Sequence, residues 1–287
     1  MHYRLTAGLV AAFALAGASF QDPPAAPKSD EAKELLKKGL EASAAAGGFT
    51  FTGSIDQDSP FGGAAMAIGG PMLAVGPEGK CTGTLGADGV SHVRIEKDKN
   101  VYDLYRKGSK IVHRQVWKGT QIASGSFASE SAAALDLAKL VKAAAKAKDV
   151  KKEAETKKVG DVDCVAIKVA LSSDLVEAEE APAGGGGFEF KMFELKRIDA
   201  TFYFGKDDNL LRKAEYKFVK GLNAMIAGAM PGGGGGDEDE DDEDCGGAGG
   251  AGGMKKSFAT TLKITFGAFS KTAAVTLPDD VKGLLQE

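Results

Sequence analysis

Alternation of apolar and polar residues dominates the chain from residue 49 onward. In the first such segment, Phe49, Phe51 and Ile55 are separated by threonine, glycine and serine residues. A period of two places these side chains on one face of a β-strand. Tight polar turns such as Asp88-Gly89 and Gly160-Asp161 follow several of these segments, and turns of this kind connect antiparallel neighbours. The sequence therefore predicts a long antiparallel meander.

The pattern divides the chain into about eleven expected strands. Their ranges are 49–55, 80–86, 90–96, 101–107, 110–118, 150–158, 162–171, 188–204, 210–220, 257–268 and 272–277. Helices are expected at 30–46 and from residue 129 to about 144, because apolar residues recur there at helical spacing. A short closing helix is expected after Pro278. So few helices cannot cover both faces of so many strands, so either the sheet closes into a barrel or one concave face stays partly open.

The first residues have the features of a signal peptide. Arg4 precedes an apolar run from Leu9 to Leu15, and Ala16-Gly17-Ala18 provides a small-x-small cleavage pattern. We expect residues 1–18 to be this signal, 19–29 a flexible lead-in and 30–287 a single domain. The expected location is periplasmic or secreted. No other stretch approaches the roughly 20 apolar residues of a transmembrane helix.

Long Gly- and Ala-rich inserts interrupt the meander at residues 58–79, 175–187 and 221–256. The last contains an unbroken acidic run from Asp237 to Asp244 in a chain whose net charge is -4. Hairpin connections of an antiparallel meander alternate between the two ends of the sheet. If the helical crossover joins antiparallel neighbours, all three inserts fall at one end. The turns at Asp88-Gly89, Gly108-Ser109, Gly160-Asp161 and Asp207-Asp208 then fall at the other.

Several common catalytic and metal-binding motifs do not occur in the sequence. Nucleophile elbows, metalloprotease motifs and phosphate-binding loops are all missing, and His92 and His113 occur singly in expected strands. We therefore expect no enzyme activity, no cofactor and no metal. With 7% aromatic residues and no motif that combines them with basic residues, nucleic acid is not an expected partner.

The cysteines of the chain allow one disulfide to be considered. Cys81 and Cys164 both lie in expected strands of a chain that we expect to meet an oxidising compartment. We therefore consider a disulfide between them, although the sequence does not fix their separation.

Several segments together resemble a known superfamily. They are a helix followed by a Phe-x-Phe-x-Gly strand, "KDVKKEAETKKVGDVDCVAIKVAL" at 148–171, "ATFYFGKDDNLLRKAEYKF" at 200–218 and "LKITFGAFSKTAAVTLPDDVKGLL" at 262–285. Their order resembles that of the LolA-like periplasmic lipoprotein and lipid carriers, a superfamily that includes LppX-type lipid-binding lipoproteins and RseB-type sensors. The resemblance implies an α+β fold, an open antiparallel β half-barrel of about eleven strands with covering helices, whose concave face holds acyl chains.

Two functions fit these observations. The first is an exported, non-enzymatic carrier or sensor that binds a lipid or acyl chain on the concave face, since each buried methylene contributes about 0.8 kcal/mol without a directional contact. The residues expected to line that face are Phe51, Ile55, Leu137, Leu140, Phe202, Phe204, Tyr216, Phe218, Leu262, Ile264 and Phe266. The alternative is a structural or protein-interaction module of the cell envelope with a filled core, which would bind an envelope protein through the Gly-rich inserts.

Overall fold

The computed structural model describes residues 29–58, 78–108, 110–115, 119–122, 130, 133–176, 193–222 and 257–286. The expected signal peptide, almost all of the lead-in and the central parts of the three inserts lie outside these ranges.

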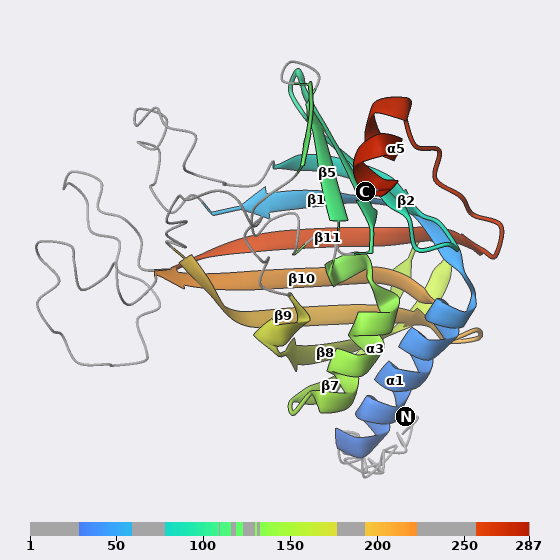
Figure 1. Ribbon diagram of the computed structural model, residues 1–287. Coiled ribbons are helices and arrows are strands. Elements are labelled where there is room, and N and C mark those ends of the chain that lie inside the picture. The colour runs from blue at the N-terminus through green and yellow to red at the C-terminus, as the bar shows by residue number, and fades with distance from the viewer. Residues whose placement is uncertain are drawn as a thin grey trace, which may run out of the picture.

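One open sheet contains eleven antiparallel strands, in the order β6-β5-β4-β3-β2-β1-β11-β10-β9-β8-β7 (Figure 1). The strands are β1 (Gly48–Gln57), β2 (Gly79–Leu85), β3 (Ser91–Lys97), β4 (Asn100–Lys107), β5 (Lys110–Gln115), β6 (Gly119–Ile122), β7 (Val150–Val159), β8 (Val162–Leu171), β9 (Phe193–Gly205), β10 (Leu211–Leu222) and β11 (Ser257–Ser270). Because β6 and β7 are the two free edges, the sheet does not close. The predicted α+β half-barrel is confirmed.

The sheet consists of two meanders that meet at its centre. Strands β1 to β6 form one meander and β7 to β11 the other. The first and last strands join them, with Phe51 opposite Phe266 and Ile55 opposite Leu262. The chain therefore passes from one edge of the sheet to the other between β6 and β7.

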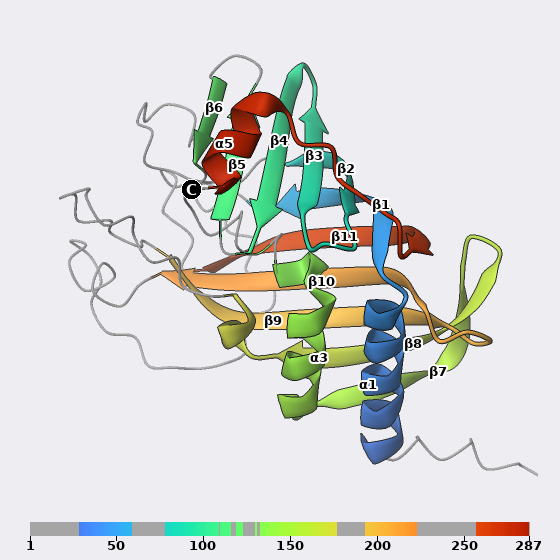
Figure 2. The ribbon, with the colours of Figure 1, turned by 45° about the vertical axis from the view of Figure 1, so that its right-hand side comes forward.

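Helices α1 (Ser29–Ala45) and α3 (Leu137–Lys146) lie against each other on one face of the sheet, which we call the inner face. Figure 2 shows them side by side across β7 to β10. Asp136 caps α3 by accepting a hydrogen bond from the Lys139 backbone N–H at 3.0 Å. The same carboxylate pairs with Arg106 of β4 at 3.2 Å, which fixes the start of α3 over the other half of the sheet.

Helix α5 (Asp279–Gln286) packs on the opposite, outer face. Val281 and Leu285 of this helix form a small cluster with Tyr105 and Val112. Since Tyr105 follows Leu104, which belongs to the inner-face core, the two side chains point to opposite faces. A short 3-10 helix, η2 (Ser173–Leu175), follows β8.

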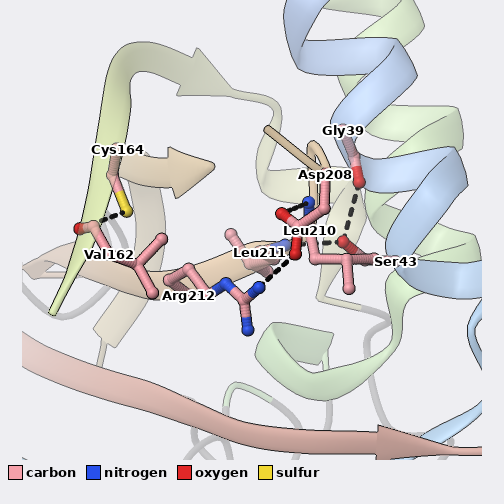
Figure 3. A network of polar contacts seen from close by, with 8 residues as sticks. All are labelled: Gly39, Ser43, Val162, Cys164, Asp208, Leu210, Leu211 and Arg212. Carbon is pink, nitrogen blue, oxygen red and sulfur yellow. Dashed lines mark hydrogen bonds and ion pairs between the residues drawn. The ribbon is translucent and has the colours of Figure 1, made fainter. Parts of the chain in front are cut away.

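A buried serine joins α1 to the sheet (Figure 3). The Ser43 hydroxyl donates to the Gly39 carbonyl at 2.7 Å and accepts from the Leu211 backbone N–H at 2.8 Å. Gly39 allows the close approach, because an added Cβ would lie 2.4 Å from Cδ1 of Phe204. A larger residue at position 39 would push the helix away from the β9 aromatic row.

The long inserts lie at one end of the sheet, opposite the four turns that were expected at the other end. Gln57 lies opposite Thr260, and Leu222 lies opposite Phe193, so the strand ends that flank all three inserts share one end, the insert end. The turns at Asp88-Gly89, Gly108-Ser109, Gly160-Asp161 and Asp207-Asp208 connect strands at the other. The crossover joins the two edge strands and not antiparallel neighbours, but it returns the chain to the insert end before β7 begins.

Two details of the predicted strands were wrong. The expected strand 110–118 is shorter, and a separate strand, β6, follows it. Residues 273–278 are not in a strand; Val275 and Leu277 pack against the α5 cluster instead. Strand β11 already has β1 and β10 on its two sides, so a strand directly after it could not form a hairpin with β11.

Candidate ligand-binding face

All of the side chains expected to line the concave face lie in one buried cluster on the inner face. The sheet contributes Phe51, Ile55, Phe202, Phe204, Tyr216, Phe218, Leu262, Ile264 and Phe266, and α3 contributes Leu137 and Leu140. Their exposure ranges from 0% to 5%. The strand residues come together because inner-face residues of neighbouring strands lie directly opposite one another. Tyr216 of β10, for example, lies opposite Ala200 of β9 and Leu262 of β11.

Aromatic rings form two groups within this cluster. Phe49 and Phe266 contact edge to face with ring centres 5.0 Å apart. Tyr216 contacts Phe202 at 5.6 Å and Phe218 at 5.9 Å. These rings provide a large apolar surface with little conformational freedom, which suits either a packed core or the wall of a ligand site.

Tyr216 also joins the sheet to the residues just before α3 (130 and 133–136), which we call the covering segment. Its hydroxyl donates to the Ala134 carbonyl at 3.0 Å, in fully buried surroundings. Burial raises the pKa of this phenol far above its usual range, so Tyr216 stays a neutral donor. The segment that leads into α3 is thereby held over β10.

A buried ion pair lies on the same face, at the insert end. Lys220 Nζ lies 2.8 Å from Glu130 Oε1, and the two side chains are 6% and 2% exposed. Lys220 shares the inner face with Tyr216 and Phe218, since all three have even positions in β10. Burial raises the pKa of the Glu130 carboxyl, and the attraction of Lys220 offsets this only in part.

Further polar atoms at this end lack hydrogen-bond partners. Both Glu130 carboxylate oxygens are buried, and beyond the ion pair of Oε1 with Lys220 neither has a hydrogen-bond partner. Thr260 Oγ1 and Gln57 Oε1 are buried and unpartnered as well. Thr260 lies directly opposite Gln57 on β1 and Phe218 on β10. We call Gln57, Glu130, Lys220 and Thr260 the polar end of the inner face.

Sequence reasoning missed the polar end, although part of its signal is visible. Lys220 continues the row Ala214, Tyr216, Phe218 at the same spacing of two, and Thr260 interrupts the row from Phe258 to Phe266. A lysine in phase with an apolar row marks a buried charge that needs a partner. Glu130 carries no such signal, because it lies 90 residues before Lys220 in the chain.

The two single histidines have ordinary strand surroundings. His92 Nε2 lies 2.8 Å from Asp103 Oδ1, and its ring stacks on Tyr105 with centres 4.5 Å apart. Burial raises the pKa of Asp103, but the hydrogen bond and charge of His92, together with the charges of Arg94 and Arg114, outweigh this effect and hold the pKa below its usual value. The His113 ring stacks on Tyr102.

The disulfide considered between Cys81 and Cys164 does not form, since both are free thiols. Cys81 belongs to the inner-face core, whereas Cys164 clusters with Ala166 and Tyr203 on the outer face. Their strands are five positions apart in the sheet, or about 24 Å at about 4.8 Å per strand. A disulfide requires Cα atoms within about 7 Å.

The described residues provide neither a metal-binding cluster nor a membrane-spanning helix. Their His, Cys, Asp and Glu side chains form no group of three or more that could hold a metal ion. Among their helices, none has the length and apolar character needed to cross a membrane.

Comparisons with known proteins give similarities only among solved structures. No protein-family model and no curated protein matches the chain. LprF from Mycobacterium bovis matches with 10% identity and a TM-score of 0.42, over 88% of this chain and 97% of that one. A domain from Vibrio parahaemolyticus, assigned to outer membrane lipoprotein sorting, matches with 6% identity and a TM-score of 0.30, over 90% and 100%. Both TM-scores are below 0.5, so neither similarity supports a conclusion about function.

Proposed function

We propose that this protein is an exported, non-enzymatic carrier or sensor that holds a lipid or acyl chain against the inner face of its sheet. The observation that carries the proposal is the continuous apolar inner face, which extends over neighbouring strands from β8 to β4. We infer a periplasmic or secreted location from the expected signal peptide.

The physical argument is the match between a long apolar surface and a long apolar ligand. Each methylene buried on this face contributes about 0.8 kcal/mol, so ten methylenes contribute about 8 kcal/mol before the cost of ordering the chain. The open sheet has two unjoined edges, and α1 and α3 are separate elements that could shift to admit a ligand. A ligand would replace contacts among side chains that are already apolar.

A photo-crosslinking experiment on the full mature chain tests this proposal directly. A fatty acid with a diazirine at mid-chain is bound and irradiated, and the modified peptides are mapped by mass spectrometry. We expect crosslinks at inner-face residues such as Phe218 and Leu262, and none at Tyr203 or Lys217, which face outward on β9 and β10. Crosslinks confined to the outer face, or no uptake together with no lipid co-purifying from the native envelope, would remove the proposal.

The second candidate is a structural or protein-interaction module of the envelope. The observation in its favour is the near-complete burial of the inner-face side chains, which describes a filled core equally well. In this case the Gly-rich inserts would bind an envelope protein.

A loop replacement separates the two candidates. Gly221 lies opposite Ser257, so a hairpin turn of about four residues can replace residues 223–256 without separating β10 from β11. Lipid uptake should persist in this variant if the protein is a carrier. Loss of capture of an envelope partner, in a protein that never takes up lipid, would favour the interaction module.

A further inference from the structure

We propose that the polar end of the inner face binds the head group of the ligand, and that this head group is neutral and donates hydrogen bonds through hydroxyl or amide N–H groups. This inference rests on the proposed lipid-binding function and makes it more specific. The main observation in its support is that buried oxygen atoms of Gln57, Glu130 and Thr260 have no hydrogen-bond partner.

These residues share one place on the sheet. Gln57 and Thr260 are directly opposite on β1 and β11, so their Cβ atoms are about 5 Å apart. Lys220 lies opposite Phe258, one inner-face position along β11 from Thr260, and so on the diagonal at about 7 Å. Glu130 reaches the same place from the covering segment through its contact with Lys220.

The chemistry of the unpartnered atoms defines what they can bind. Gln57 Oε1 and the two Glu130 oxygens can only accept hydrogen bonds while the carboxyl is ionised, and Thr260 Oγ1 can accept or donate. Buried polar atoms without partners are costly, so a ligand that supplies donors gains more here than in water. Hydroxyl and amide groups provide such donors.

The charge of the site argues against an anionic head group. Lys220 alone would attract a carboxylate or phosphate, but Glu130 lies 2.8 Å from it and the pair is neutral overall. An added anion would meet the buried oxygen atoms of Gln57, Glu130 and Thr260. A neutral donor group avoids that repulsion.

The position of the polar end also orients the ligand. Phe218, Leu262 and Ile264 continue from Lys220 and Thr260 along the inner face toward the turn end. An acyl chain bound along these rows would extend away from the inserts, with its head group near the strand ends that flank them.

Binding of four palmitoyl ligands to the wild-type protein provides the first test. Monopalmitoylglycerol carries hydroxyl donors, palmitamide carries amide donors, methyl palmitate carries none and palmitate is an anion; all share the same chain. In a fluorescent fatty-acid displacement assay, we expect at least one of the two donor ligands to bind about tenfold more tightly than methyl palmitate. Comparison of the two donor ligands distinguishes a hydroxyl from an amide head group.

Charge variants provide the second test. Glu130→Gln leaves the buried Lys220 without its counter-charge, so we expect the preference to move about tenfold toward palmitate. The matched control is Lys217→Met, an exposed outer-face lysine of the same strand, which should leave all ratios unchanged. Ratios of dissociation constants are compared, because they do not depend on the folded fraction of each variant.

The outcomes separate this inference from the function on which it rests. If all four ligands bind equally, or Glu130→Gln leaves the ratios unchanged, the head-group site is refuted while the carrier function stands. If none of the four ligands binds, both the head-group site and the carrier function are refuted. If palmitate binds wild type most tightly, the site recognises anions and the inference is wrong.

Discussion

Loss of the Ser43 hydroxyl should weaken the attachment of α1 to the sheet by an amount that the contacts allow us to work out. In Ser43→Ala the Leu211 N–H loses its acceptor, and Leu211 is fully buried. An unsatisfied buried N–H costs about 1–3 kcal/mol. Alanine is the better helix former by about 0.5 kcal/mol, so the expected net loss in the free energy of unfolding is about 0.5–2.5 kcal/mol.

Urea unfolding followed by circular dichroism measures this loss. With a slope of about 3 kcal/mol/M, the midpoint should fall by about 0.2–0.8 M. The matched control is Ala44→Ser, the reverse exchange at the exposed neighbour in α1, which isolates the helix-propensity contribution. The unfolding slope should stay the same in both variants.

The reasoning would be refuted if Ser43→Ala were as stable as the wild type after correction for the helix-propensity effect measured in Ala44→Ser. It would mean that the Leu211 N–H finds water or another acceptor when the hydroxyl is removed. The position of α1 would then depend on its apolar contacts alone.

Three further measurements examine other buried groups. Asp103→Asn should lower the unfolding free energy by about 1 kcal/mol near pH 5 and by less near pH 2. The pKa of Asp103 is lower in the folded state, so its carboxylate stabilises the fold above the unfolded-state pKa, and this stabilisation is lost as the pH falls through the folded-state pKa. An equal loss at both pH values would contradict this. Burial raises the pKa of Cys81 to about 11, so peptide mapping should show its alkylation near pH 8 only after unfolding. Lys220→Met should cost about 3 kcal/mol, and adding Glu130→Gln should restore most of it, whereas additive losses would show that the two side chains do not interact.

The rows of inner-face residues could be predicted because they depend only on a local period of two. Once Phe202 and Phe204 are assigned to one face, the antiparallel register fixes which residues of β10 share it. The in-phase lysine at 220 was visible by the same rule, but its partner was not. Pairing of Glu130 with Lys220 depends on how the covering segment lies over the sheet, which no local pattern encodes.

Other features depended on the order of strands, which the sequence pattern does not specify. The alternation at 272–277 resembles a strand, but both sides of the preceding strand β11 are already paired, with β1 and β10. Cys81 and Cys164 both lie in strands, yet only the sheet order shows that five positions separate them. The shared end of the inserts was predicted from the parity of successive hairpins, but the prediction assumed that the crossover joins antiparallel neighbours, whereas it joins the two edge strands.

The pairing of β1 with β11 has a consequence for how the chain reaches its native state. These strands begin about 210 residues apart, so closing the centre of the sheet requires one of the longest-range contacts in the molecule. Until β11 is available, β1 and β10 each present an unpaired edge beside a row of apolar side chains. A protein truncated before residue 257 would keep both edges open, so premature termination should yield an aggregation-prone chain and not a smaller stable one.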